Sequence, residues 1–179
     1  VVNRIDKIGL NEWIIFANGK QFFYLNDDKE ILKKIPLIAP FGLDSVSFTK
    51  DNFSSFANVE KTAEGNYILV YLRHVLQIKY KEGVFYTTKF LQSLQSNEGI
   101  FIDKNQHIFI GNEGYINEYT KSWKLLQRLQ LPELIQVRAI VKDQNGSLWI
   151  GTRNGIYVFK NNKLVQKIAE QNGLLNEFI

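Results

Sequence analysis

The sequence of 179 residues contains no cysteine, no methionine and only three prolines. Without cysteine there is no disulfide, no thiolate zinc site and no thiol nucleophile. The longest unbroken apolar stretch, Tyr67–Leu72, is far shorter than the roughly 20 residues of a membrane-spanning helix, so no membrane insertion is expected. Because the chain begins at Val1 without a basic segment followed by an apolar one, we expect an excised or processed piece of a longer protein.

The sequence also lacks a large net charge and clusters of residues with the same charge. The chain has 22 Lys and Arg against 18 Asp and Glu, and the basic residues are spread along the sequence. Phosphate binding needs cations gathered in one place, so no nucleic-acid partner is expected despite the pI near 9.1. Hydrophobic residues make up 45% of the chain, which is enough for a folded domain and excludes a disordered chain.

A hairpin-rich unit recurs along the chain at intervals of about 40 residues. The last copy contains three β-rich runs, Val137–Asp143, Ser147–Thr152 and Gly155–Phe159, separated by short turns. Such runs are typical of hairpins rather than helices. Earlier copies are centred on equivalent second runs at Ile108–Gly111, Tyr67–Leu69 and Trp13–Ile15.

The apolar pattern of these second runs indicates sheets that are covered on both faces. A strand with one wet face alternates apolar and polar residues, whereas Tyr67–Leu72 and Leu148–Ile150 are continuous. Sheets stacked face to face supply that cover, and the repeat length is typical of β-propeller blades. We therefore predict an all-β chain of four-stranded antiparallel blades, about four of them, in a partial propeller.

The spacing predicts a single β-propeller region over 1–179. Its blades are expected at approximately 1–36, 46–95, 96–133 and 134–172, with 173–179 beginning a further blade. Pro36–Phe56 carries extra length and is the best candidate for a loop.

The fourth strand of each unit is expected to be a protected outer edge. Lys163–Ile168 and Glu30–Ile35 carry lysines among apolar residues, which discourages pairing with other sheets. Trp123–Leu129 and Thr88–Leu94 also fit amphipathic helices. We favour strands there because both segments occupy the fourth-strand place of the repeat.

The segment Asp143–Phe159 closely resembles the repeat of two-component regulator propellers. It has an aspartate, a turn glycine at Gly146, the run Leu-Trp-Ile-Gly-Thr, and a second glycine, Gly155, that opens an aromatic-ending strand. Earlier units depart from this pattern, with Gln106 for the turn glycine and Asn112 for the threonine.

The resemblance implies a sensor region on the periplasmic or extracellular side of the cytoplasmic membrane. Such propellers usually precede a membrane segment and a histidine kinase or DNA-binding module. Many of them sense products of carbohydrate breakdown.

The motif residues are expected to have structural roles. Trp149 can stack on a sugar ring, but its repeat partners Phe109 and Ile68 are interchangeable hydrophobes, which favours packing between blades. Aspartate at a hairpin turn accepts backbone N–H bonds, and no cluster of aspartates indicates calcium. The structural set is Asp103, Asp143, Gly146, Trp149, Gly151 and Gly155.

No catalytic residue, metal site or cofactor is expected. His74 and His107 fall in different positions of different units, and neither a third histidine nor a cysteine exists to complete a zinc site. No Gly-x-Ser-x-Gly elbow is present. The glutamates are scattered, so their spacing does not indicate a carboxylate pair for glycoside hydrolysis.

Propeller geometry indicates where a ligand would bind. Loops between second and third strands share one face of the disc with the loops between blades. Each residue there can equally be a solvated turn residue. The candidates for this ligand face are Asn18, Arg73, His74, Asn112, Glu113, Arg153 and Asn154.

We therefore interpret the chain as a non-catalytic recognition module of a two-component signalling protein, with a small carbohydrate as the expected ligand. One alternative is a propeller lyase or hydrolase. Another is a scaffold or adhesion propeller.

An incomplete ring of blades would leave apolar sheet faces and unpaired edges exposed. We therefore predict that the isolated chain associates with other propeller blades or with a second copy of itself. Light scattering should report a mass above that of one chain, and a monodisperse monomer would contradict this prediction.

Overall fold

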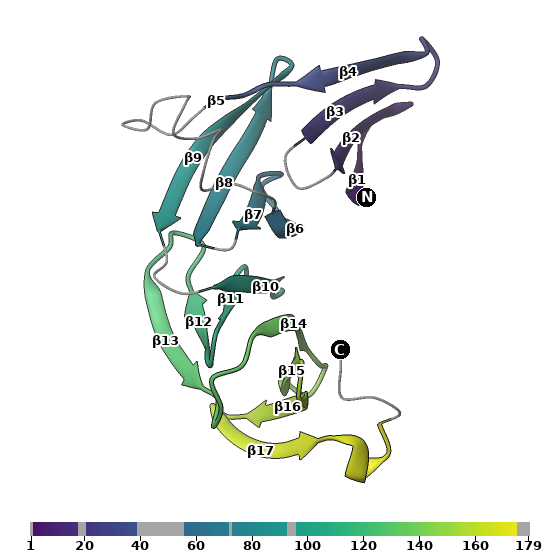
Figure 1. The fold of residues 1–179 in the computed structure, drawn as a ribbon. Coiled ribbons are helices and arrows are strands. Elements are labelled where there is room, and N and C mark those ends of the chain that lie inside the picture. Colours follow the sequence, from purple (N-terminus) through teal and green to yellow (C-terminus); the bar gives the residue numbers. More distant parts are fainter. Residues whose placement is uncertain (1, 18–20, 39–55, 72, 93–95, 175–179) are drawn as a thin grey trace. The chain divides into compact units, whose positions relative to one another are not determined.

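The computed structural model describes residues 2–17, 21–38, 56–71, 73–92 and 96–174 (Figure 1). The chain divides into two compact units, residues 1–92 and 93–179. The regular structure of the described residues is β-strand apart from the short 3-10 helix η1 (Glu170–Asn172). The predicted all-β class is confirmed. No helix among these residues is long and apolar enough to cross a membrane.

The first unit contains two sheets. The first sheet is antiparallel, with its four strands in chain order: β1 (Val2–Gly9), β2 (Glu12–Ala17), β3 (Gln21–Asn26) and β4 (Ile31–Ile35). The second sheet has four antiparallel strands and a fifth strand beside the last one: β6 (Phe56–Lys61), β7 (Tyr67–Tyr71), β8 (His74–Lys81), β9 (Val84–Gln92) and β5 (Leu37–Ile38).

The second unit repeats the four-stranded pattern twice. Its third sheet consists of β10 (Asn97–Ile102), β11 (Ile108–Asn112), β12 (Tyr115–Tyr119) and β13 (Leu125–Gln130). Its fourth sheet consists of β14 (Val137–Lys142), β15 (Leu148–Thr152), β16 (Gly155–Lys160) and β17 (Lys163–Ile168). The strands preferred over helices at Trp123–Leu129 and Thr88–Leu94 are found as β13 and β9. Strand β13 begins at Leu125, two residues later than expected, and residues 93–94 lie outside the described residues.

Strand β5 was not foreseen from the sequence. Leu37 and Ile38 pair in parallel with Phe85 and Tyr86 of β9, so this short strand covers an outer edge that would otherwise expose unpaired backbone groups. It lies at the start of the segment interpreted as a loop, Pro36–Phe56. Most of that segment, residues 39–55, lies outside the described residues.

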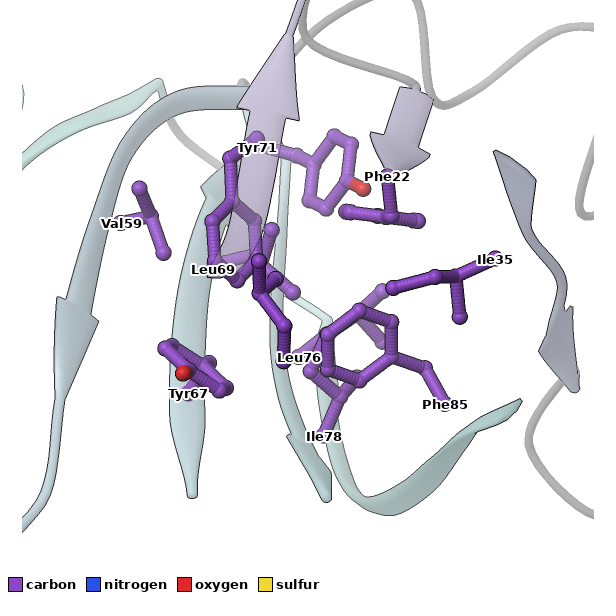
Figure 2. Packing of buried hydrophobic residues seen from close by; sticks show 11 residues of the cluster. Phe22, Ile35, Val59, Tyr67, Leu69, Tyr71, Leu76, Ile78 and Phe85 are labelled. Atoms are coloured by element: carbon purple, nitrogen blue, oxygen red, sulfur yellow. The ribbon is translucent and has the colours of Figure 1, made fainter. Parts of the chain in front are cut away.

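The two sheets of the first unit pack face to face. Phe16 of β2 lies against Tyr67 of β7 with ring centroids 4.7 Å apart. Figure 2 shows Phe22 and Phe85 in the same cluster, where their rings meet edge to face at 5.1 Å. Every residue of β7 is buried, which confirms that its continuous apolar run is covered on both faces. Burying a large apolar side chain stabilises the fold by roughly 1.5–3 kcal/mol.

The sheets of the second unit also pack face to face, and a glycine lets them approach. Phe109 and Ile116 of the third sheet share a buried cluster with Ile150 and Tyr157 of the fourth. Gly111 of β11 faces Val137 of β14, and a Cβ built on Gly111 would lie 2.7 Å from the Val137 Cβ. Such a separation is a clash, so the sheets can approach this closely only because residue 111 has no side chain.

Trp149 differs from the expectation that it is hidden between blades. Its repeat partners Phe109 and Ile68 are 2% and 0% exposed, but Trp149 is only half-buried. Neighbouring Ile150 packs in the cluster with the third sheet, so Trp149 points to the opposite face of its strand. No other sheet in the described part of the second unit packs on that face. Val141, its cross-strand partner in β14, is accordingly 54% exposed.

The first sheet has a comparable apolar face. Phe16 points into the cluster of the first unit, whereas Ile15 points to the opposite face and pairs with Ile5, which is 55% exposed. Leu32 on β4 is exposed as well. These side chains give a physical basis for the association predicted above, because exposed apolar surface favours a partner.

Gly111→Ala should destabilise the second unit by about 1–3 kcal/mol, because the added methyl group would overlap Val137. Val137→Ala should also destabilise it by leaving a cavity. The double variant should cost less than the sum of the two single variants, since truncating Val137 makes room for the new methyl group. A double-mutant cycle from urea unfolding measures this coupling.

Gly146→Ala is the matched control. Gly146 has φ of 81° and nothing lies within 4 Å of a Cβ built there, so alanine adds backbone strain without a clash. Its effect should add to that of Val137→Ala within about 0.5 kcal/mol. Equal additivity of the Gly111 and Val137 variants would contradict the close approach.

Candidate functional site

Some of the residues expected on the ligand face are exposed to solvent, and others are buried. In the first unit, Arg73 is exposed, but His74 is buried and stacks on Phe90 with ring centroids 5.3 Å apart. His74 is therefore a packing residue. It is the first residue of β8, a strand whose first three side chains are buried. Asn18 lies outside the described residues.

In the second unit the expected ligand-face residues divide in the same way. Asn112 is buried, and its side-chain Nδ2 donates to the carbonyl of Ile110 at 3.0 Å. Glu113 and Arg153 are exposed, and Asn154 is half-buried. Asn112 therefore supports its own strand, and the exposed polar groups of this set are Glu113 and Arg153.

Asn154 is held by a polar cluster around Glu133, which lies between β13 and β14. The Asn154 amide donates to one carboxylate oxygen of Glu133. Tyr157 Oη and Lys167 Nζ contact the other oxygen at 2.8 Å and 2.9 Å. The hydrogen bond from Lys167, with those from Tyr157 and Asn154, lowers the pKa of Glu133 below its usual value. This cluster fixes the connection between two sheets, which is a structural role.

The motif aspartates organise the turns at the opposite ends of the strands. Asp143 Oδ1 accepts the backbone N–H groups of Asn145 and Ser147 at 2.8 Å and 2.9 Å, and Oδ2 accepts Trp149 Nε1 at 3.0 Å. The hydrogen bond from Trp149 is the largest of the contacts that lower the pKa of Asp143. Asp143 thus has the turn role that its position in the repeat implies.

Asp103 forms the same turn in the third sheet and adds a contact between sheets. Its Oδ1 accepts the backbone N–H groups of Asn105 and His107 at 2.9 Å and 3.0 Å. Its Oδ2 lies 3.2 Å from Nζ of Lys142 in β14. The turn of the third sheet is therefore tied to the first strand of the fourth.

A pocket of about 470 Å³ opens beside these turns, between the third and fourth sheets. Its volume falls in the range of small-molecule sites. Its polar lining comes from turns of both sheets and from strands β12, β13 and β14, and its apolar floor comes from the buried cluster between the sheets. The lining residues are Asn105, His107, Phe109, Glu118, Gln127, Leu129, Lys142, Gly146, Leu148, Phe159, Asn161 and Asn162.

A hydrogen-bonded network crosses this pocket. His107 Nδ1 lies 2.7 Å from Oε1 of Glu118, and Gln127 Nε2 donates to Oε2 of the same carboxylate. Gln127 Nε2 also donates to Oδ1 of Asn162 at 3.0 Å. Because Asn162 lies in the turn between β16 and β17, the amide of Gln127 links the two sheets.

Sequence reasoning missed this network. It treated His107 as isolated and did not single out Glu118. The signal was present in the repeat, since Glu118 pairs with Phe109 as Val158 pairs with Trp149. An acidic residue at a position that is apolar in the best-preserved copy is a departure that the sequence alone displays.

Within the residues that the structure describes, no group of three or more His, Asp or Glu side chains is arranged to hold a metal ion. The polar side chains that line the pocket are hydrogen-bonding groups. Carboxylate, imidazole and amide groups can bind a polar ligand, and His107 with Glu118 has the composition of an acid–base pair.

The family model for the two component regulator propeller matches residues 130–154. This segment runs from the end of β13 to the turn after β15 and includes Asp143, Gly146, Trp149 and Gly151. No curated protein matches the sequence.

Solved propeller structures match almost the whole chain. The extracellular domain of a putative hybrid two-component system from B. thetaiotaomicron has a TM-score of 0.70 and 20% identity, over 99% of this chain and 24% of that one. Virginiamycin B lyase from Staphylococcus aureus has a TM-score of 0.65 and 14% identity, over 94% and 55%. A surface component of the type-IX secretion system of Porphyromonas gingivalis has a TM-score of 0.67 and 14% identity, over 99% and 28%.

The chain thus spans about a quarter of the two-component domain that it matches. At these identities the likeness establishes the fold, and the motif at residues 130–154 adds the family of the repeat. The chain is thus a segment with the β-propeller fold, in which residues 130–154 match the repeat of two-component regulator propellers.

Proposed function

We propose that this chain belongs to the extracytoplasmic recognition region of a two-component signalling protein and binds a ligand without transforming it. The observation that carries the proposal is the repeat at residues 130–154, of which Val137, Leu148 and Ile150 pack in the buried cluster between the third and fourth sheets. The similarity to an extracellular domain of a putative hybrid two-component system supports the location.

The packing of the sheets supports a way to pass a signal. The pocket is lined by both sheets of the second unit, and the Lys142–Asp103 ion pair and the Gln127–Asn162 hydrogen bond also join them. A ligand that contacts both sheets stabilises one arrangement of the pair over others. That bias can be transmitted to other parts of the signalling protein.

A small carbohydrate is the ligand class that we propose. The resemblance of the repeat points to it, and the polar lining of the pocket is compatible with it. Amides and carboxylates complement sugar hydroxyls, which both donate and accept hydrogen bonds.

Catalysis is the second candidate, because one observation favours it. His107 and Glu118 lie in hydrogen-bond contact inside the pocket, and such a pair can act as a general base. A lyase is also among the similar propellers. The fold itself decides nothing between binding and catalysis.

We expect neutral oligosaccharides to bind this chain and to remain intact. Thermal unfolding with cellotriose, xylotriose or maltotriose should show at least one of them raising Tm by a few degrees, as ligand binding to the folded state requires. Chromatography of the same mixtures after prolonged incubation should show no product.

If a product accumulates in proportion to protein concentration, the chain is an enzyme and the proposal of binding without catalysis is wrong. If no oligosaccharide shifts Tm, the carbohydrate ligand is wrong. As a location test, protease added to spheroplasts, from which any outer membrane has been removed, should digest this region of the native protein. Full protection in intact spheroplasts would contradict the extracytoplasmic placement.

A further inference from the structure

Two residues of the third sheet differ in chemistry from their counterparts in the fourth. His107 stands in the place of Ser147, since the backbone N–H of each bonds to Oδ1 of the turn aspartate four residues earlier. Glu118 stands in the place of Val158, since each pairs with the aromatic residue of the second strand. Both differences replace a small or apolar side chain with an ionisable one.

These two side chains meet each other. His107 Nδ1 and Glu118 Oε1 are 2.7 Å apart, although His107 lies in the turn between β10 and β11 and Glu118 lies in β12. The side chain of Glu118 is only 9% exposed and lies over a floor that includes Leu129, Leu148 and Phe159. Burying a carboxylate among apolar groups is unfavourable. The fourth sheet folds with valine at this position, so the fold does not require the carboxylate.

A feature that opposes stability and is not required by the fold indicates a functional site. The location agrees with this, because Glu118 and His107 line the pocket of about 470 Å³. Gln127 is bonded both to Glu118 and to Asn162 across the pocket. A ligand that replaces Gln127 at either partner would change the link between the two sheets.

The charges of the pocket favour a neutral ligand. Lys142 lies 3.2 Å from Asp103 and is compensated by it. The carboxylate of Glu118 is held by His107 and Gln127, but each carboxylate oxygen can accept more than one hydrogen bond. Neighbouring hydroxyl groups can donate to such a carboxylate and accept from the amides of Asn105 and Asn162.

We propose that this pocket is the binding site for a neutral oligosaccharide, of which about one or two rings enter the pocket, with Glu118 as the principal acceptor of its hydroxyl groups. The site deepens the proposed function and rests on it. It lies beside the aspartate turns, at the ends of the strands opposite to Glu113 and Arg153.

The test replaces His107 and Glu118 of the third sheet by the residues at the equivalent positions of the fourth sheet, Ser147 and Val158. In the double variant His107→Ser, Glu118→Val, the saccharide found to bind the chain should lose affinity about tenfold or more by isothermal titration calorimetry. Tm should stay equal or rise, because a hydrophobe replaces a buried charge. Glu118→Gln, which preserves shape, should lose a similar factor in affinity and serves if the double variant does not fold.

The matched control is the double variant Glu113→Gln, Arg153→Ala on the opposite turns, which should keep the affinity within about twofold. Binding that survives Glu118→Gln but is lost in this control would overturn the pocket and leave saccharide recognition standing. A lower Tm with unchanged affinity in the His107 and Glu118 variant would also overturn it, because the pair would then be structural. If cellotriose, xylotriose and maltotriose all fail to bind the unaltered chain, the saccharide class and this site fail together.

Discussion

Face-to-face packing of four-stranded sheets is the constraint on which the rest of this structure depends. A strand can be apolar on both faces only if something covers each face, and β7 shows the result, with every residue buried. In the second unit the side chain of Val137 lies so close to Gly111 that no side chain fits at position 111. This packing determines the positions of the turns, the outer edges and the pocket.

The same packing separates structural polar groups from candidate ligand groups. Asp143 and Asp103 satisfy backbone N–H groups at turns, and Glu133 fixes the connection between sheets through Lys167, Tyr157 and Asn154. Each of these carboxylates has a role in shaping the chain. Glu118 has no such role, because its partners are side chains that line a pocket and its counterpart in the fourth sheet is Val158.

The sequence predicted the fold well because the fold is repetitive. Turn aspartates, glycines and continuous apolar runs recur at fixed positions, and each has a local physical meaning. Trp149 was harder to place, since its burial depends on what covers the last sheet and not on its own strand. Strand β5 was missed because two residues carry no periodic signal and owe their pairing to the edge of β9.

The site was predicted less well for a related reason. Spacing along the chain placed Asn112 and His74 near turns, but the inward direction of their side chains depends on the start and register of each strand. The contact between His107 and Glu118 joins a residue of the β10–β11 turn to a residue of β12, so it follows from strand pairing and not from proximity in sequence. Comparing the copies of the repeat position by position is the step that reveals it.

The most direct test of the central claim is a nuclear Overhauser measurement on the second unit. Face-to-face packing predicts strong cross-peaks between the α-protons of Gly111 and the methyl protons of Val137, and between the ring of Phe109 and side chains of the fourth sheet. Their absence in a folded chain that keeps its four-stranded hairpins would show that the sheets do not pack against each other, and the account would fail.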